Sequence, residues 1–109
     1  MAKPYDMDCP VAATLDVIGE RWTILILRDL FLQGPRRFQD FQDSFIAASP
    51  NTLAARLKGL EVNGIIERDV YQSNPIRARY VLTQKGRSLG PVMLALRKWG
   101  NEHTSSQGI

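Results

Sequence analysis

The sequence predicts a mainly α-helical fold with one β-hairpin, and three observations support this prediction. Apolar residues recur at helical spacing through residues 10–45, residues 49–64 have the pattern of a capped helix, and residues 65–82 have the pattern of two strands joined by a turn. Helices followed by a hairpin and a last helix predict an α+β architecture, the winged helix-turn-helix.

The composition indicates one small globular domain. The chain has 109 residues, of which 44% are hydrophobic and 23% are charged, which suits a single modest core. We expect one domain over residues 1–109, with an ordered core at about 9–103. Because no apolar run reaches the length of a membrane span and the first residues lack the apolar segment of a signal peptide, we expect a cytoplasmic protein without a membrane partner.

The first half of the chain is expected to form a helical scaffold. Residues 10–18 carry apolar side chains at helical spacing, and residues 21–32 are apolar nearly all round, which predicts a central, buried helix. Phe38, Phe41 and Phe45 then share one face of a short helix. We interpret them as core residues that pack against the following helix.

The segment after this short helix is the predicted second helix of the helix-turn-helix. Ser49 is the expected N-cap, Pro50 takes the first helical position, and Gly64 ends the helix. Leucines at helical spacing form its inner face. The outer face presents the small and polar residues Asn51, Ala55, Lys58 and Gly59. Thr52 and Arg56 lie on the flank of this face. Such a face fits a major groove, although an ordinary amphipathic surface helix has a similar pattern.

The hairpin adds a second basic element. We expect strands at 65–71 and 77–82 around the turn residues 72–76. Arg77 and Arg79 share one face of the second strand, and Arg77 lies beside the turn, where a wing would approach the phosphate backbone. Arg68 extends this row from the first strand. The alternative for Arg68 and Arg79 is a solvated strand face on which the arginines pair with neighbouring acidic residues.

The last helix is expected to start with Thr83 as N-cap and to run to Trp99 or His103. One side of it carries an apolar stripe: Leu89, Val92, Met93, Leu96 and Trp99. A domain of this size has no obvious core left for that stripe, so we expect it to be buried against the equivalent helix and the first helix of a second subunit. The sequence therefore predicts a homodimer that dimerises through its N- and C-terminal helices. A tail that folds back on its own subunit is the alternative.

Charge is unevenly placed along the chain. Residues 1–50 carry five Lys or Arg against seven Asp or Glu, whereas residues 51–109 carry nine against four. The basic half contains the predicted outer helix face and wing, as expected of a surface that binds duplex DNA. The candidate DNA-binding residues are Ser49, Asn51, Thr52, Ala55, Arg56, Lys58, Arg77 and Arg79. A homodimer of such domains would read a pseudo-palindromic operator.

Other function classes find less support. A winged-helix scaffold that binds a partner protein through the same helix face is the alternative function. The single cysteine and the single histidine are far apart and do not form a metal-binding pattern, and we expect no enzyme and no cofactor. Asp16, Glu20 and Asp29 are interpreted as helix caps or solvated helix positions rather than an acid/base pair.

Three segments carry a family resemblance: CPVAATLDVIGERWTILILRDLFLQGPRRFQDFQ, SPNTLAARLKGLEVNGIIERDVY and RYVLTQKGRSLGPVMLALRKWG. Through them the chain from Cys9 to about His103 resembles the HxlR family of bacterial winged helix-turn-helix transcriptional regulators. The resemblance implies a dimeric repressor or activator, with the recognition helix at 49–62, the wing at about 72–79, and dimerisation through the first and last helices.

Cys9 precedes Pro10 and is therefore the expected N-cap of the first helix, where the helix dipole favours a thiolate. The nearby Asp6 and Asp8 oppose this effect, and a lone cysteine is often only a small apolar residue. The resemblance implies a role, since some HxlR-like regulators sense quinones, aldehydes or oxidants through a cysteine at the matching Cys-Pro position. Redox or electrophile sensing and an inert thiol both remain open.

A small-molecule effector is a further candidate partner. Its pocket is expected between the first helix, the central helix and the dimer partner, with Trp22 and Trp99 as candidate lining residues. Tryptophans at such positions are more often part of the core.

Overall fold

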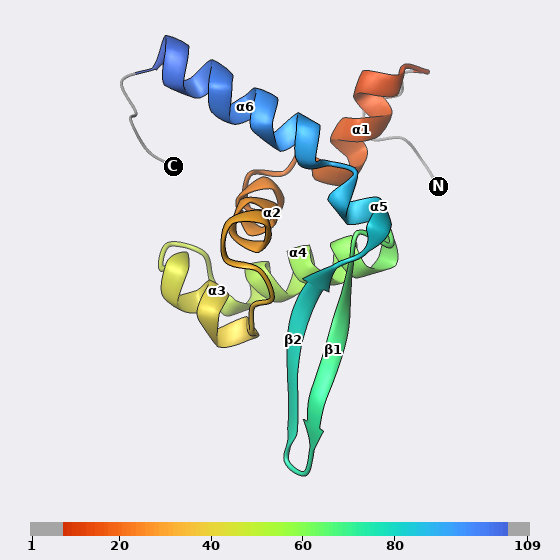
Figure 1. The fold of residues 1–109 in the computed structure, drawn as a ribbon, viewed down its shortest axis with the longest axis vertical. Coiled ribbons are helices and arrows are strands. Elements are labelled where there is room, and N and C mark those ends of the chain that lie inside the picture. Colours follow the sequence, from red (N-terminus) through yellow and green to blue (C-terminus); the bar gives the residue numbers. More distant parts are fainter. Residues whose placement is uncertain (1–7, 105–109) are drawn as a thin grey trace.

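The computed structural model describes residues 8–104. Its elements follow in the order α1 (Pro10–Ile18), α2 (Arg21–Gln33), α3 (Phe38–Ser44), α4 (Pro50–Val62), β1 (Ile66–Ser73), β2 (Ile76–Leu82), α5 (Gln84–Arg87) and α6 (Gly90–His103). The β1–β2 hairpin projects from a helical body as a long arm, and α1 and α6 lie at the opposite end of that body (Figure 1). The predicted winged helix-turn-helix is thus confirmed.

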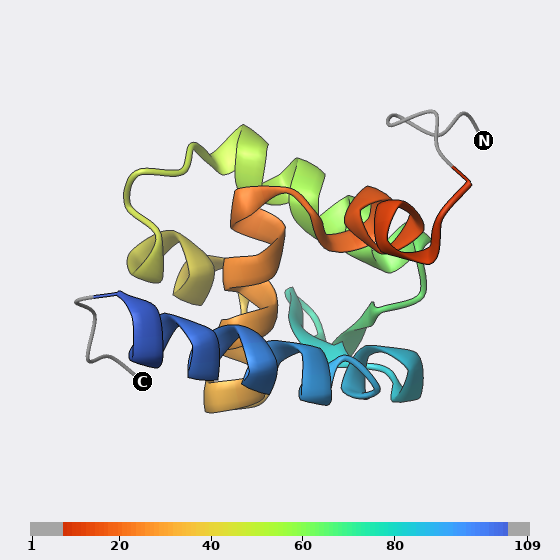
Figure 2. The same cartoon turned by 90° about the horizontal axis from the view of Figure 1, so that it is seen from above.

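The central helix α2 runs between α4 and α6 (Figure 2). Its apolar residues contact the core in two ways. Ile26, Leu27 and Leu30 are buried in the core, and Trp22 packs against the edge of that core. Asp29 departs from the prediction. It is only 4% exposed rather than solvated, because it faces the interior beside Arg36, whose side chain is also largely covered.

The helix-turn-helix is formed by α3 and α4. Phe41 and Phe45 of the predicted phenylalanine stripe are buried, and Phe38 packs against the same cluster. The leucine face of α4 completes the core with Leu53, Leu57 and Leu60. The helix ends as predicted, since Gly64 follows the C-cap residue Asn63 with a positive φ of 72°, which favours glycine.

The wing is an antiparallel hairpin that is longer than expected. Its pairing extends to Ser73 opposite Ile76, so only Asn74 and Pro75 form the turn. The register of the two strands shifts between Val70 and Gln72. A third segment joins it at one residue. Arg36 exchanges two main-chain hydrogen bonds with Tyr80, of 3.1 and 2.6 Å, and so attaches the start of the helix-turn-helix to β2.

The C-terminal segment is divided into two helices rather than one. Thr83 is the N-cap of α5, as predicted, and accepts a hydrogen bond from the N–H of Gly86. This helix stops after one turn, and α6 starts at Gly90. Pro91 at the start of α6 explains the break, because proline lacks the N–H that would continue a helix from the preceding turn.

The apolar stripe of the last helix is used in two ways. Leu89 and Met93 pack against the core of their own chain, whereas Val92, Leu96 and Trp99 are exposed. Trp99 is 62% exposed and is therefore not a core residue of its own chain. Val11 and Leu15 on α1 are exposed as well. None of the helices in residues 8–104 is both long and apolar enough to cross a membrane.

Candidate nucleic-acid interface

The outer face of α4 is exposed where the sequence predicts it. Asn51, Ala55, Lys58 and Gly59 are exposed, while the leucines on the other side of the helix hold it against α2 and α3. Helical periodicity places these exposed residues on one side because the helix has 3.6 residues per turn. The result is a convex strip of short side chains with one lysine, which can approach a groove closely.

The start of α4 is fixed by a local hydrogen-bond network. The Ser49 hydroxyl oxygen accepts from the N–H of Thr52 at 3.1 Å, and the same hydroxyl donates to the Thr52 hydroxyl oxygen at 2.9 Å. Ser49 is thus the predicted N-cap. Both hydroxyl groups lie at the positive end of the helix dipole, a position suited to a phosphate contact.

Arg56, on the flank of α4, is turned toward the start of α2. Its Nε lies 3.3 Å from Oε2 of Glu20. The same carboxylate oxygen accepts hydrogen bonds from the N–H groups of Trp22 and Thr23 at 2.9 and 3.0 Å, so Glu20 is the helix cap that the sequence predicts. Sequence reasoning missed the Glu20–Arg56 pair, because the two residues are far apart in the chain. A DNA contact by Arg56 stays a prediction.

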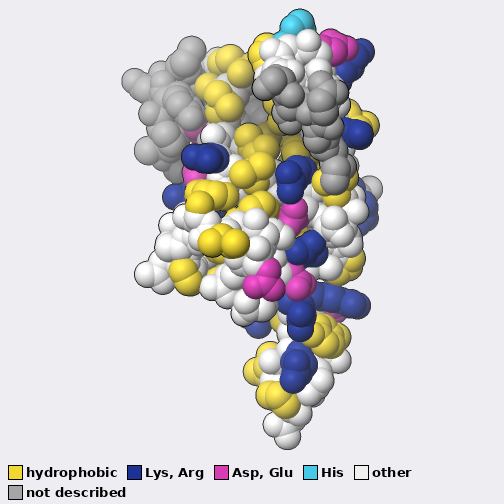
Figure 3. Space-filling view, turned by 90° about the vertical axis from the view of Figure 1, so that its left-hand side faces the viewer, with side chains coloured by type: hydrophobic (Ala, Val, Ile, Leu, Met, Phe, Trp, Pro, Cys, Tyr) yellow, Lys and Arg dark blue, Asp and Glu magenta, His cyan; other side chains and the backbone are white. Residues whose placement is uncertain are grey.

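The two wing arginines lie in different environments. Arg77 is exposed beside the turn, and no carboxylate within residues 8–104 pairs with it. Arg79 pairs with its cross-strand neighbour Asp69 at 3.0 Å, and its guanidinium lies 5.4 Å from the centre of the Tyr71 ring. The ion-paired alternative therefore describes Arg79 in the structure. Basic side chains continue from the lower part of the body onto the wing, with acidic ones between them (Figure 3).

The two arginines before α3 make contacts within the protein that stabilise this helix. Arg36 is largely covered and donates hydrogen bonds to the carbonyl of Asp40 at 3.1 Å and the hydroxyl of Ser44 at 3.0 Å. Arg37 is exposed, and its backbone N–H donates to the Asp40 carboxylate at 2.8 Å. That backbone hydrogen bond, with the Arg37 guanidinium close by, holds the pKa of Asp40 below its usual value.

Cys9 is the N-cap residue of α1, as predicted, and is partly buried. Its side chain accepts no capping hydrogen bond. Groups of three or more acidic, histidine or cysteine side chains that could hold a metal ion are absent from the described part of the chain. The expected effector pocket would include a second subunit and stays a prediction. Within the chain, an apolar cavity lies between α2 and α6 and is lined by neither Trp22 nor Trp99.

Comparison with known proteins gives the family. Residues 17–108 match the model of the HxlR-like helix-turn-helix family. An uncharacterized HTH-type transcriptional regulator of Synechocystis is 43% identical over 94 residues, which cover 86% of this chain and 69% of that protein. The HTH-type transcriptional regulator YodB of Bacillus subtilis is 36% identical over 95 residues, which cover 86% of this chain and 84% of YodB.

Solved structures of regulators have the same fold as this chain. The redox regulator HypR in its oxidized form superimposes with a TM-score of 0.82 at 35% identity and covers 90% of this chain and 100% of its own. Reduced YodB superimposes with a TM-score of 0.74 at 35% identity, over 94% of this chain and 100% of its own. The matching family and relatives are transcriptional regulators, and HypR is a redox regulator, which confirms the prediction of a regulator rather than an enzyme. The chain belongs to the HxlR-like family of helix-turn-helix transcriptional regulators.

Proposed function

We propose that the protein regulates transcription as a homodimer that binds a pseudo-palindromic operator, with α4 in the major groove and the wing on the phosphate backbone. The observation that carries the proposal is the outer face of α4, where Asn51, Ala55 and Lys58 form an exposed strip. Asn51 can hydrogen-bond base edges, and Lys58 can contact either bases or phosphates. Exposed Arg77 supplies a phosphate contact from the wing.

Dimerisation is supported by the exposed apolar residues of α1 and α6. Val11, Leu15, Val92, Leu96 and Trp99 lie on the two helices at the end of the body opposite the wing. Apolar side chains of this size gain free energy when a second subunit covers them. To read half-sites about one helical turn apart, such a dimer must present its two α4 helices on the same side.

The test is fluorescence anisotropy of the reduced protein with the intergenic duplex flanking its own gene and with a scrambled duplex, at near-physiological salt. We expect the native duplex to bind at least ~10³-fold more tightly. Lys58→Ala should weaken binding, whereas Lys98→Ala on α6, at the other end of the body, should not. Equal and weak binding to both duplexes would contradict the proposal.

The alternative of a protein-binding scaffold predicts a different salt dependence. Binding through phosphate contacts falls steeply as salt rises, because counterions are released from the DNA. An interface that rests on buried apolar area changes little with salt. A titration at several salt concentrations therefore separates the two functions.

Sensing through Cys9 is a second proposal, and it rests on the relatives. One neighbour is a redox regulator whose oxidized form has been solved, and another was studied after diamide treatment. Cys9 lies at the start of α1, next to the helix that would form part of the dimer interface. Diamide or a quinone should change DNA affinity in the wild type. A Cys9→Ser protein that keeps the full response would contradict this role.

A further inference from the structure

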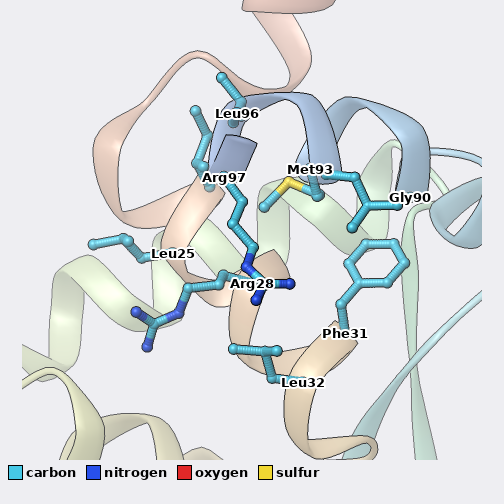
Figure 4. A pocket seen from close by; sticks show the side chains of 10 residues that line it. Leu25, Arg28, Phe31, Leu32, Gly90, Met93, Leu96 and Arg97 are labelled. Carbon is cyan, nitrogen blue, oxygen red and sulfur yellow. The ribbon is translucent and has the colours of Figure 1, made fainter. Parts of the chain in front are cut away.

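An apolar groove lies between the central helix and the last helix. It has a volume of about 420 Å³ and is lined from α2 by Leu25, Phe31 and Leu32 and from α6 by Met93 and Leu94, among others. Phe31 of α2 points toward Gly90 of α6, and Arg97 of α6 points toward α2, whereas Leu25 and Arg28 extend to one side (Figure 4). A volume of this size falls within the range of small-molecule sites, about 300–1,000 Å³.

The groove uses a different face of α6 from the one proposed for dimerisation. Gly90, Met93, Leu94 and Arg97 are spaced by three and four residues and line the groove, whereas Val92 and Trp99 do not line it and lie on another side of the helix. Leu96 borders both surfaces. A second subunit on the Val92 and Trp99 side would therefore leave the groove open along most of its length.

Two arginines are placed at this apolar groove, Arg28 on α2 and Arg97 on α6. The Arg97 side chain extends from α6 toward α2 (Figure 4), and no carboxylate within residues 8–104 pairs with it. Arg28 is paired with Asp29 through an Nη2–Oδ1 contact of 3.1 Å. Among the described residues that line the groove there are two arginines and no acidic side chain, so a bound anion would meet positive charge beside apolar walls.

We propose that this groove binds a small amphipathic carboxylic acid. Its apolar body lies along Leu25, Phe31 and Met93, and its carboxylate is held by Arg97, with Arg28 as a second donor. Guanidinium groups donate paired hydrogen bonds to carboxylates, and such charge-assisted contacts are stronger than neutral ones. An uncharged molecule of the same shape would fill the groove but leave Arg97 without its partner.

The site is connected to the helix-turn-helix through Asp29. The second oxygen of the Asp29 carboxylate lies 3.8 Å from Nη2 of Arg36 and accepts no hydrogen bond within the described residues. Arg36 in turn holds Asp40 and Ser44 of α3 and pairs with Tyr80 of the wing. When a ligand carboxylate draws Arg28 away from Asp29, Asp29 is left with Arg36 as its remaining cation. A ligand in the groove therefore acts on both elements of the proposed DNA-binding surface.

Methionine methyl resonances test binding directly. Protein labelled with ¹³C-methyl methionine gives few methyl signals, since it has 3 methionines. The signal that is missing from the spectrum of a Met93→Leu variant is the signal of Met93 in the groove. Octanoate, titrated below its aggregation concentration, should shift the Met93 signal saturably, and octanol should bind about tenfold more weakly, as expected for a lost charge-assisted contact. An unmoved Met93 signal, or equal affinity for octanoate and octanol, would overturn the proposal.

Variants of α6 provide the controls. Arg97→Gln should weaken octanoate binding about tenfold and remove the preference over octanol, whereas Lys98→Gln, which removes the same charge from an exposed neighbour outside the groove, should leave both unchanged. Equal effects of the two variants would mean that only overall charge matters, and the proposed site would be wrong.

The rival occupant of the groove is a second copy of the chain. If Leu94→Gln at the groove lowers the oligomeric state in light scattering, the copy fills the groove and the proposal fails.

The regulatory consequence rests on the proposed DNA-binding function and is measured separately. Saturating octanoate should change operator affinity severalfold in the wild type and not in Arg97→Gln, and operator DNA should change octanoate affinity by the same factor. Unchanged operator affinity would overturn the coupling through Asp29. A protein whose Met93 signal titrates but which binds no operator would contradict the proposed function and leave the groove assignment standing.

Discussion

At the scale of single residues, Glu20 shows how one carboxylate joins two elements. Its Oε2 caps α2 through the N–H groups of Trp22 and Thr23 and also lies within ion-pair distance of Arg56 on α4. A capping carboxylate is favoured at a helix N-terminus by the unsatisfied N–H groups and by the helix dipole. The same contact orients α4 relative to α2, so the direction of the proposed recognition helix depends partly on this residue.

Gly86 is required by a close approach of two backbones. A Cβ at this position would lie 2.1 Å from the carbonyl oxygen of Ile65, the residue before β1. We therefore expect Gly86→Ala to lower the free energy of unfolding by roughly 1–3 kcal/mol, as overpacking does in a rigid core. Urea denaturation measures the change.

Gly100 provides the matched control for this substitution. It lies in α6, and a Cβ there would meet no atom within 4 Å. Gly100→Ala should be neutral or stabilising by up to about 1 kcal/mol, because alanine has the higher helix propensity. Similar losses for both variants would show that the contact with Ile65 is not the cause of the effect.

At the scale of elements, α3 is a short helix whose first turn depends on Asp40. Because hydrogen bonding from Arg37 lowers the pKa of Asp40 in the folded protein, the ionised form stabilises the fold. This contribution is complete above the ordinary carboxyl pKa of 3.8 and is lost as the pH falls through the lower pKa of the folded state. Asp40→Asn should therefore reduce the loss of stability that occurs as the pH falls from neutral to below 3.8, by up to roughly 1 kcal/mol for a helix cap.

Thermal or urea unfolding at a series of pH values measures this effect. Asp43→Asn on the same helix removes an equal formal charge from an exposed position that does not cap the helix. That variant should follow the wild-type pH dependence. A parallel decline of stability with acid in all three proteins would exclude Asp40 as the source.

The wing is the element whose two arginines allow a direct comparison. Arg77→Ala should weaken DNA binding uniformly across sequences and reduce the salt slope by about 1, as loss of one phosphate contact does. Arg79→Ala should have a smaller effect, because Asp69 already offsets its charge. Anisotropy titrations at several salt concentrations measure both slopes. A larger effect for Arg79 than for Arg77 would place the DNA backbone on a different part of the wing.

At the scale of the whole molecule, the apolar residues of α1 and α6 carry the dimer hypothesis. Trp99→Glu places a charge where an aromatic side chain would be buried, and truncating such an anchor alone costs about 2 kcal/mol or more, which is roughly 30-fold in affinity. We expect a monomer in light scattering at micromolar concentration. Lys98→Glu, on an exposed position of the same helix, should remain dimeric. A monomeric wild type would remove the hypothesis itself.

Most elements could be predicted from the sequence because their signals are local. Ser49, Thr83 and Glu20 act as helix caps where their positions before apolar runs predict them, and Gly64 ends α4 with a positive φ. The exposure of Asn51 and Lys58 follows from the leucine periodicity of the same helix. These features depend on neighbours within a few residues, so a single stretch of sequence contains the information.

The tertiary structure decided what depends on residues far apart in the chain. The burial of Asp29, the pairing of Arg36 with Tyr80 and the contact between Glu20 and Arg56 have no local pattern, because each arises where separate elements meet. The division of the last apolar stripe between the chain's own core and an exposed face has the same cause. The sequence by itself therefore determined the order of elements and the outer face of α4, whereas only packing decided which arginines are engaged within the protein and where the groove between α2 and α6 lies.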